Sequence, residues 1–438
     1  MAKIHFIGIG GIGLSALARF LHKEGHNISG SDIKETHITR ALKSEGIIVN
    51  VPHAKENIID QDMVIYSAVI KEDNVEYQEA TKKGIKTFSR KEALKFILKD
   101  KKVFAVAGAH GKSTTSAILG SIIDGSMLIG AESNQFGSNM RYIKGDDLVF
   151  EADESDESFL NSNPYLAIVT NCEPEHMEYY NHDLKRFYQA YKKFLDIAKV
   201  RVINAEDEYL STLKIDAIKL YPSIDITDIN YIVEENRPYT SFNLKDFGEF
   251  KVFGIGEHVA LDASLVILAA IYEGLEVETI REKLKGYKGI KKRFDILVSD
   301  DKKAIIDDYA HHPTEIEATL KSAKKFATLM GYKNVNAIWQ PHKYSRVLDN
   351  LERFKECFKD VDKLTILPVW SAGEKKVEID FESLFKKYNP RFADKVLREE
   401  DKLKLIKDDK CIDEFDGELI IGFGAGDLTY QLRGNTSE

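Results

Sequence analysis

A glycine-rich segment between an apolar strand and a helix constrains the fold of this chain more than any other feature. Residues 103–107 are apolar, Gly108-Ala-His-Gly-Lys112-Ser113-Thr114 follows directly, and residues 116–123 have the pattern of a helix. A glycine loop in this position lets backbone N–H groups surround a phosphate, and the helix N-terminus adds partial positive charge. The segment therefore predicts a nucleotide-binding α/β domain, in which Lys112 reaches the β- and γ-phosphates and Ser113 holds Mg²⁺.

This loop is shorter than the strict phosphate-loop pattern, which places a glycine where the chain has Val106. A tight strand–helix turn with an incidental lysine is the structural alternative, and the strand–loop–helix context favours phosphate binding. The residues predicted to bind ATP within the loop are Gly108, Ala109, His110, Gly111, Lys112, Ser113 and Thr114.

A second glycine loop, Gly8-Ile-Gly10-Gly11-Ile-Gly13, lies between an apolar strand and a helix predicted at residues 14–23. The next strand ends in Asp32. This pattern places a pyrophosphate on a helix N-terminus and an acid near a ribose, so it does not distinguish NAD from a UDP-sugar. Close packing without a ligand is the structural alternative. Because the first apolar stretch stops at Gly8, we expect a buried strand there and not a signal peptide.

The alternation of strands and helices predicts an α/β fold of three tandem domains. We expect a Rossmann-like domain at residues 1–100. A central domain at 101–292 combines a P-loop ATPase-like parallel sheet with a small antiparallel sheet at 230–257. A Rossmann-like C-terminal domain occupies 293–438, after a boundary in the basic segment 288–293.

Acidic and histidine-containing loops follow two further predicted strands of the central domain. Glu151-Ala-Asp-Glu-Ser-Asp156 follows one strand, and Asn171 to Glu178, which contains His176, follows another. Because the carboxyl ends of parallel strands meet at one edge of a sheet, these loops are expected beside the phosphate loop, where a carboxylate commonly holds Mg²⁺. A solvated acidic loop and a surface histidine are the alternatives. The predicted metal residues are Ser113, Glu151 and His176.

Two loops of the C-terminal domain carry further polar motifs, Asp307-Asp308-Tyr309-Ala-His311-His312 and His342-Lys343-Tyr-Ser-Arg346. Cations after a strand are suited to binding a carboxylate or a phosphate, and the histidine pair lacks other ligands at zinc spacing. A helix-capping turn and a solvated face are the alternatives. A third loop, residues 422–427, is predicted equally well as a structural turn or a ligand contact.

The net charge of −9 excludes a general nucleic-acid binder, which needs an excess of Lys and Arg. Three widely spaced cysteines, Cys172, Cys357 and Cys411, favour neither a disulfide framework nor a metal site, so we expect a reducing, cytoplasmic location. No segment approaches the roughly 20 apolar residues of a membrane span.

Taken in their order along the chain, these motifs resemble those of the Mur ligase family over essentially the whole sequence. The residues that carry the resemblance are Gly8–Gly13, Gly108–Thr115, Glu151–Asp156, Asn171–Tyr179, Arg293-Phe-Asp295, Asp307–Glu315 and Gln340–Arg346.

The resemblance implies a peptidoglycan-precursor ligase with UDP-binding, ATPase and C-terminal domains. ATP, assisted by Mg²⁺, would activate the lactyl carboxylate of UDP-N-acetylmuramate as an acyl phosphate, and L-alanine would then form the amide. Neither nucleic-acid binding nor membrane insertion is expected, and the protein is expected to be a monomer or homodimer. The implied UDP-sugar residues are Gly8, Gly10, Gly11, Gly13, Asp32 and Ser67. Arg293 and Asp308 would contact ATP; Tyr309, His311, His342 and Arg346 would place the amino acid; and Lys112, His176 and His311 would be catalytic.

The chain departs from the family pattern at a few positions. Lys343 stands where Arg is usual, Ser113 where Thr is usual, and His258-Val-Ala-Leu-Asp262 replaces His-Asn-Ala-Leu-Asn, so Val259 removes an expected adenine contact. Three alternatives remain open from the residues: a related ligase that attaches murein tripeptide to the same sugar nucleotide, an NAD-dependent dehydrogenase, and a non-catalytic nucleotide-binding regulator.

Overall fold

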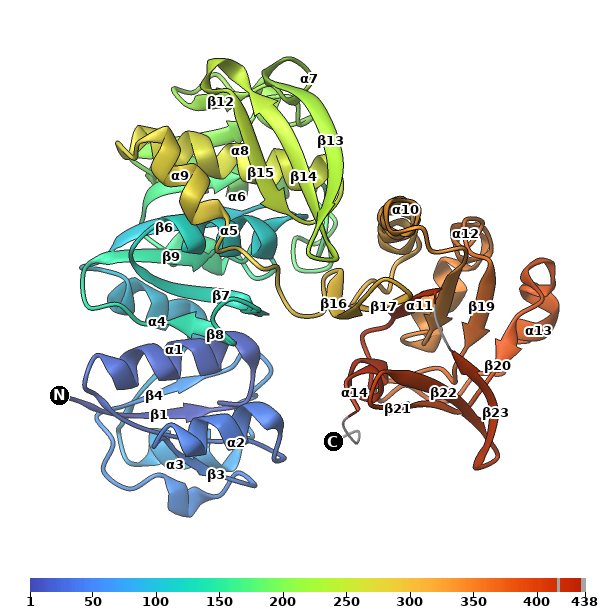
Figure 1. Ribbon diagram of the computed structural model, residues 1–438. Helices are drawn as coiled ribbons and strands as arrows, with labels where there is room; N and C mark the ends of the chain where they lie inside the picture. Colours follow the sequence, from blue (N-terminus) through green and yellow to red (C-terminus); the bar gives the residue numbers. More distant parts are fainter. Residues whose placement is uncertain (416–417, 435–438) are drawn as a thin grey trace. The chain divides into compact units, whose positions relative to one another are not determined.

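The computed structural model describes residues 1–415 and 418–434 (Figure 1). The chain divides into two compact units. The amino-terminal unit comprises residues 1–229, 242–252 and 258–288, and the carboxy-terminal unit comprises 230–241, 253–257 and the chain from Gly289 onward. The longest segment of the carboxy-terminal unit, which starts at Gly289, thus begins inside the basic segment 288–293.

The first sheet of the amino-terminal unit is a parallel five-stranded sheet with the order β3-β2-β1-β4-β5. This order reverses between β1 and β4, which is the position where doubly wound sheets bind ligands, and it confirms the predicted Rossmann-like fold. The strands are β1 (Lys3–Ile7), β2 (Asn27–Ser31), β3 (Ile48–Asn50), β4 (Met63–Tyr66) and β5 (Lys86–Ser89), and the helices are α1 (Ile12–Lys23), α2 (His37–Ser44), α3 (Val75–Lys82) and α4 (Arg90–Ile97).

The second sheet has seven strands in the order β12-β11-β10-β6-β9-β7-β8, parallel except for the β7–β8 pair. β6 lies inside this sheet, and its apolar sequence is buried on both faces, as in other parallel sheets covered by helices. The strands are β6 (Lys102–Ala107), β7 (Ser126–Ser133), β8 (Ser138–Arg141), β9 (Asp147–Glu151), β10 (Pro164–Val169), β11 (Val200–Asn204) and β12 (Ile218–Leu220).

The helices that accompany the second sheet in the chain are α5 (Lys112–Ile122), α6 (Leu184–Ile197), α8 (Glu257–Tyr272) and α9 (Val277–Leu284), with a short α7 (Pro222–Asp225). α5 begins at Lys112, four residues before the helical pattern predicted from Ser116. The start of the helix could not be predicted from apolar periodicity, because residues Lys112 to Thr115 are all polar.

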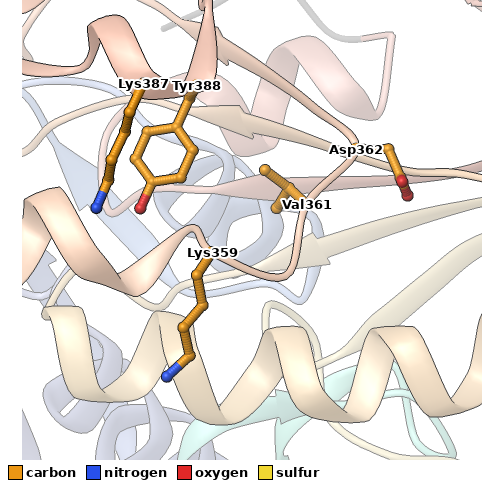
Figure 2. A pocket seen from close by; sticks show the side chains of 5 residues that line it. All are labelled: Lys359, Val361, Asp362, Lys387 and Tyr388. Carbon is orange, nitrogen blue, oxygen red and sulfur yellow. The ribbon is translucent and has the colours of Figure 1, made fainter.

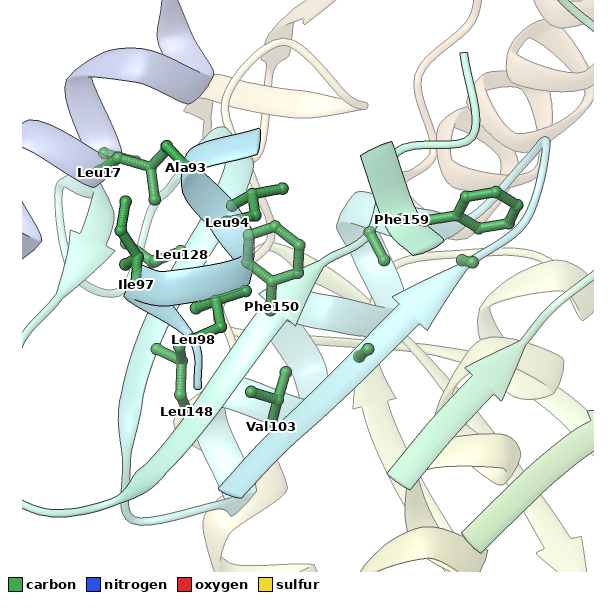
Figure 3. Close-up of a cluster of buried hydrophobic side chains, with 14 of the residues drawn as sticks. Leu17, Ala93, Leu94, Ile97, Leu98, Val103, Leu128, Leu148, Phe150 and Phe159 are labelled. Carbon is green, nitrogen blue, oxygen red and sulfur yellow. The ribbon is translucent and has the colours of Figure 1, made fainter. Parts of the chain in front are cut away.

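One hydrophobic core joins the two sheets of the amino-terminal unit (Figure 3). Leu17 of α1 and Leu94 of α4 belong to the same buried cluster as Leu128 and Phe150 of the second sheet. A polar contact supports this packing, because Arg19 donates a 2.7 Å hydrogen bond to Asn139, whose amide donates to the Ile12 carbonyl at 2.6 Å. The shared core thus joins α1, the helix after the first glycine loop, to β6, the strand that leads into the second glycine loop.

The predicted antiparallel sheet near residues 230–257 is confirmed as β13 (Ile226–Glu234), β14 (Arg237–Leu244) and β15 (Glu249–Phe253). Each of these strands has residues assigned to both compact units.

The carboxy-terminal unit contains a six-stranded sheet in the order β16-β17-β24-β18-β19-β20, in which β16 is antiparallel to β17. Its strands are β16 (Asp295–Ser299), β17 (Lys303–Asp308), β18 (Val335–Trp339), β19 (Lys363–Ile366), β20 (Arg391–Phe392) and β24 (Glu418–Phe423), and its helices are α10 (Pro313–Met330), α11 (Tyr344–Asp349), α12 (Leu351–Cys357), α13 (Phe381–Leu384) and α14 (Leu428–Leu432).

A second antiparallel sheet in this unit was not predicted. It consists of β21 (Lys395–Glu399), β22 (Lys402–Lys407) and β23 (Lys410–Phe415). The high charge of this segment suggests a surface loop, yet Leu403 and Leu405 alternate with lysines and are fully buried in a core cluster. This alternation of apolar and charged residues with a period of two is typical of a half-buried strand, so the strand could have been predicted from the sequence. No helix within residues 1–415 and 418–434 is long and apolar enough to cross a membrane.

Phe159 allows a test of the shared core. Its ring is fully buried, stacks on Phe194 at 5.0 Å and meets Tyr191 at 5.4 Å between ring centroids. We expect Phe159→Ala to lower the free energy of unfolding by about 3–5 kcal/mol, because it leaves a cavity. Urea unfolding measures this, with Phe96→Ala as the control, since that ring is 39% exposed. Equal losses in the two variants would contradict the assignment.

Candidate functional site

The loop between β6 and α5 has the glycine requirements of a phosphate loop. Gly108 has φ +145°, and a Cβ there would lie 2.0 Å from Thr170 Oγ1. Gly111 has φ +80° and is the N-cap of α5. Only glycine combines these backbone angles with such close neighbours, so both positions are fixed by geometry.

Lys112 lies at the first turn of α5 and reaches back over this loop. Its ammonium donates to the carbonyls of Gly108 (2.5 Å) and Ala109 (3.2 Å) and to Glu154 Oε1 (2.8 Å). Burial opposes its charge, but the nearby carboxylates, chiefly Glu154, outweigh burial and raise the pKa of Lys112. The loop therefore keeps a positive charge throughout the physiological pH range.

Ser113 and Glu151 are brought together, as their predicted common role requires. The Ser113 hydroxyl donates to Glu151 Oε1 at 2.9 Å, and the N–H of Gly130 donates to Glu151 Oε2 at 2.8 Å. A carboxylate and a hydroxyl thus stand side by side at the carboxyl ends of β9 and β6.

His176 lies in a different cluster from Glu151. Its ring and the carboxylates of Glu154 and Glu175 place ligand atoms within 4.8 Å of one another. One oxygen of Glu154 is buried without a hydrogen-bond partner in the described chain, and burial raises the pKa of this carboxyl. Neither Glu154 nor Glu175 was predicted from the sequence as a metal ligand. Position 154 was visible as part of the acidic motif, but the motif does not tell which of its acids faces inward.

The loop after β10 is tied directly to the phosphate loop. Thr170 Oγ1 donates to the His110 carbonyl at 2.6 Å, and the Asn171 side chain both accepts from the His110 N–H (3.0 Å) and donates to its carbonyl (2.9 Å). Glu173 lies 3.3 Å from the ring of His110. Three loops at one sheet edge thus form a connected structure.

The loop between β1 and α1 is held by the acid predicted to face a ribose. The N–H of Gly10 donates to Asp32 Oδ2 at 2.8 Å, and a Cβ at position 10 would lie 2.7 Å from that oxygen. Gly8 has φ +81°, and a Cβ there would lie 3.1 Å from the Cβ of Ser67. Gly8, Gly10, Asp32 and Ser67 are therefore neighbours, and Gly11 and Gly13 continue the loop into α1.

Arg90, at the start of α4, was missed. Its guanidinium lies beside Gly13, where a Cβ would be 3.1 Å from Nε, and Nη1 is 3.4 Å from Ser158 Oγ. Its Nε is buried without a hydrogen-bond partner among the described residues. A lone arginine at a helix start belongs to no motif, so no local pattern predicts its position beside Gly13.

In the carboxy-terminal unit, the loops after β17 and β18 bring the predicted amino-acid residues together. The rings of His311 and His342 are 5.9 Å apart, and Tyr309 meets His311 at 5.2 Å between centroids. Arg346 donates from Nη1 to His342 Nδ1 at 2.7 Å. His311 Nδ1 lies 2.9 Å from the Tyr309 carbonyl.

Both histidines are neutral near pH 7. Burial lowers the pKa of His342 to about 4, with help from the positive charge of Arg346. Burial also lowers the pKa of His311, against the opposing effect of Glu315. A carbonyl can only accept a hydrogen bond, so His311 carries its proton on Nδ1 and leaves the Nε2 lone pair free.

Asp308 is buried, and both of its oxygens accept backbone N–H groups, from Phe294 (2.7 Å) and Ala310 (2.8 Å). Burial raises its pKa to about 6, although the exposed guanidinium of Arg293 acts in the opposite direction. Within its own unit Asp308 therefore fixes the segment that carries Arg293. The predicted ATP contacts of both residues stay predictions.

The turn at residues 422–427 has a structural role. Gln340 accepts from the Leu428 N–H at 3.1 Å and donates to Asp427 at 2.5 Å, and a Cβ at Gly426 would lie 2.7 Å from Trp370. Trp370 also forms an isolated β-bridge with His342, so it borders the loop that follows β18. A shallow cavity of about 380 Å³ lies elsewhere in this unit, before β19, at the opposite ends of the strands (Figure 2).

Comparison with known families matches three sequence models along the chain. The Mur ligase family catalytic domain matches residues 3–102, the Mur ligase middle domain matches 106–253, and the Mur ligase glutamate ligase domain matches 292–426.

Individual relatives extend over the full chain. The UDP-N-acetylmuramate–L-alanine ligase of Campylobacter curvus is 62% identical over 99% of this chain and 100% of its own length. The ligase of the same name from Helicobacter pylori is 54% identical over 99% of this chain and 96% of its own length. Among solved structures, the UDP-N-acetylmuramate-alanine ligase of Thermotoga maritima aligns with a TM-score of 0.82 at 27% identity, covering 99% of this chain and 98% of its own. A murein peptide ligase of Psychrobacter arcticus shares the fold, with a TM-score of 0.63 at 19% identity, covering 98% of this chain and 97% of its own.

The geometry of the phosphate loop predicts the effect of a single methyl group. Gly108→Ala should weaken ATP binding by about tenfold or more, a cost of about 1.4 kcal/mol, because the Cβ collides with Thr170 and moves the loop. Calorimetric titration with ATP measures this. Gly137→Ala is the control, since Gly137 also has a positive φ but open space around its Cα. Matching ATP affinities in the two variants would contradict the prediction.

Proposed function

Because the chain belongs to the Mur ligase family, we propose that it is an ATP-dependent ligase that joins L-alanine to UDP-N-acetylmuramate. The observation that carries the proposal is the end-to-end similarity to relatives of that name, at 54–62% identity. The glycine loops, the lysine and the two histidine loops provide chemistry suited to this reaction.

The reaction has two steps. An oxygen of the lactyl carboxylate attacks the γ-phosphorus of ATP, an O–P bond forms, the bond to the β-phosphate oxygen breaks, and ADP leaves. The neutral amine of L-alanine then attacks the acyl carbon of the acyl phosphate. A C–N bond forms, phosphate leaves, and the nitrogen loses a proton to a base. The first step brings an anion to a polyanion, so positive charge must be positioned in advance.

Lys112 supplies that charge. Its ammonium is fixed beside the loop carbonyls, and the carboxylates of Glu154 and Glu151 keep it protonated. It is therefore placed to balance the charge on the γ-phosphate during transfer.

The donor chemistry of this sheet edge also fits Mg²⁺, which prefers carboxylate, hydroxyl and phosphate oxygens. Ser113 and Glu151 would hold the ion, which when bound neutralises phosphate charge. The cluster of Glu154, Glu175 and His176 offers a second set of ligands.

The UDP part of the sugar nucleotide is assigned to the first sheet. Gly8 to Gly13 would receive the diphosphate at the N-terminus of α1, near Ser67, and Asp32 holds the loop through the Gly10 N–H.

His311 is the base proposed for the alanine amine. It is neutral, and the hydrogen bond of Nδ1 to the Tyr309 carbonyl leaves Nε2 free to accept a proton. The neighbouring Arg346, oriented by neutral His342, is suited to the alanine carboxylate. Tyr309, 37% exposed, borders the same position.

The alternatives are not supported by the relatives. The murein peptide ligase of Psychrobacter arcticus is only 19% identical, which shows a common fold alone and does not support a murein-tripeptide ligase. An NAD-dependent dehydrogenase and a non-catalytic regulator both leave the Lys112 loop and the full-length ligase similarity unexplained. Mass spectrometry of the product with L-alanine, tripeptide or other amino acids as acceptor tests the substrate directly.

Lys112→Ala tests the charge-balancing role. We expect phosphate release that depends on both UDP-N-acetylmuramate and L-alanine to fall at least about a hundredfold, because the transferred phosphoryl group loses its cation. A coupled phosphate assay measures the rate. Retained affinity for UDP-N-acetylmuramate shows that the variant is folded, and Lys99→Ala, an exposed lysine, is the control. Turnover of Lys112→Ala close to that of the parent protein would refute the role.

The pH dependence tests His311 as the base. The base must be neutral, so kcat/KM for L-alanine should fall as the pH drops through a pKa below the ordinary 6.5. The negative charge of Glu315 favours protonated His311. Glu315→Gln should therefore lower this pKa and move the acidic limb to lower pH, which steady-state rates at saturating ATP and sugar nucleotide would measure. An acidic limb that stays in place or moves to higher pH contradicts the proposal.

A chemical control separates the two steps. Hydroxylamine is a neutral nucleophile near pH 7 and captures an acyl phosphate as a hydroxamate without a base. His311→Ala should lose ligation of L-alanine by about 10²–10⁴-fold but keep hydroxamate formation. Loss of both activities would place His311 in the first step.

A further inference from the structure

A buried carboxyl group lies under the phosphate loop and has no role in the reaction described above. Asp262 belongs to α8, a helix whose neighbouring residues Ala260, Ala263 and Leu265 are fully buried and apolar. Asp262 itself is 4% exposed. Among the described residues, no lysine, arginine or histidine contributes to the shifted pKa of this carboxyl.

The carboxyl is in contact with the last glycine of the loop. A Cβ at Gly111 would lie 2.6 Å from Asp262 Oδ1 and 2.9 Å from Oδ2, so both oxygens lie against the backbone that immediately precedes Lys112. The hydroxyl of Thr115, on the first turn of α5, faces the same carboxyl, and its oxygen is buried without a hydrogen-bond partner among the described residues. Asp262 therefore supports both the loop and the first turn of α5.

The surroundings of this carboxyl favour its neutral form. Burial raises the pKa of Asp262 well above its ordinary value, and the Thr115 hydroxyl opposes this only in part. The other titratable group that faces it is Tyr287, whose own pKa is raised by burial and by a negative charge on Asp262. An ionised carboxylate here would be buried without a cation and would repel the phosphates of a nucleotide.

We propose that Asp262 is a positioning residue for ATP, whose carboxyl packs against Gly111 and holds the phosphate loop and the first turn of α5 in the conformation that receives the phosphates. The assignment of ATP to this loop rests on the proposed function. The side chain acts through the loop and does not itself take part in phosphoryl transfer.

Two substitutions separate the carboxyl's shape from its charge. Asp262→Asn keeps the shape and is permanently neutral, so it should bind ATP within about threefold of the parent protein at pH 7.5. Asp262→Leu removes the polar contacts and should weaken ATP binding by about tenfold or more, with unchanged affinity for UDP-N-acetylmuramate. Ser264→Ala is the control, because this buried serine lies on the same helix and its hydroxyl has no partner in the described chain. Calorimetric titration measures each affinity.

The protonation state has a readout that does not depend on activity. A native carboxyl with a raised pKa keeps a proton that the unfolded chain releases above about pH 4. The parent protein should therefore lose stability relative to Asp262→Asn as the pH rises from about 4 towards the native pKa, by a factor of about ten in the unfolding equilibrium constant per pH unit. The gap in thermal unfolding temperature between the two proteins should widen with pH, in favour of Asp262→Asn.

Two results would overturn the proposal. Parallel unfolding curves at all pH values would mean that the native carboxyl is ionised. Normal ATP affinity in Asp262→Leu would mean that the loop does not need it. Failure of the parent protein to form a ligation product would instead count against the proposed function, because ATP binding and unfolding are measured without turnover.

Discussion

The ammonium group of Lys112 connects the loops on which the site depends. Glu154 is fully buried and has no other cation as a partner in the described chain, so removing the lysine leaves a buried acid that is costly to ionise. The Glu154 carbonyl also accepts from the Tyr180 hydroxyl at 2.5 Å. The loops after β6, β9 and β10 therefore meet around one charge. In the proposed function the same charge balances the transferred phosphoryl group.

This arrangement is useful only if the two glycine loops keep a fixed relation to each other. Both belong to the amino-terminal unit, and one buried cluster runs from α1 and α4 into the second sheet. Interiors of this kind are close-packed and have low compressibility, so the loops are carried on a rigid support. Arg90 lies at this junction, beside Gly13 and within 3.4 Å of Ser158, and joins the first glycine loop to the end of the acidic loop.

The parts of the site that were predicted from sequence are those where backbone geometry restricts the residue type. A Cβ at Gly108 would collide with Thr170, and one at Gly111 would collide with Asp262. Only glycine fits at these two positions, and their spacing forms a motif that can be recognised in the sequence. Which acid of a cluster turns inward is decided by tertiary packing. Glu151 was predicted and does meet Ser113, whereas Glu154 pairs with Lys112 and was missed.

The same reasoning accounts for the fold. The parallel sheets were predicted because their buried strands are continuous apolar runs, whereas β21 to β23 were missed because charged residues alternate with the buried ones. Asp262 was noted as a departure from a family motif. Its position against Gly111 depends on where the tertiary fold places α8 beside the phosphate loop, and no local pattern contains that information.

In the carboxy-terminal unit, burial determines which groups carry charge. His342 is kept neutral by burial and by Arg346, and a neutral imidazole can accept the hydrogen bond that orients the guanidinium. Positive charge at this loop then comes from two side chains. The guanidinium of Arg346 can form bidentate hydrogen bonds with a carboxylate, whereas the ammonium of Lys343 is a point charge. In the proposed reaction, one planar cation and one point charge would bind the single carboxylate of alanine, and the neutral His311 beside them would receive the proton of the amine. The protonation states would then separate binding of the carboxylate from activation of the amine.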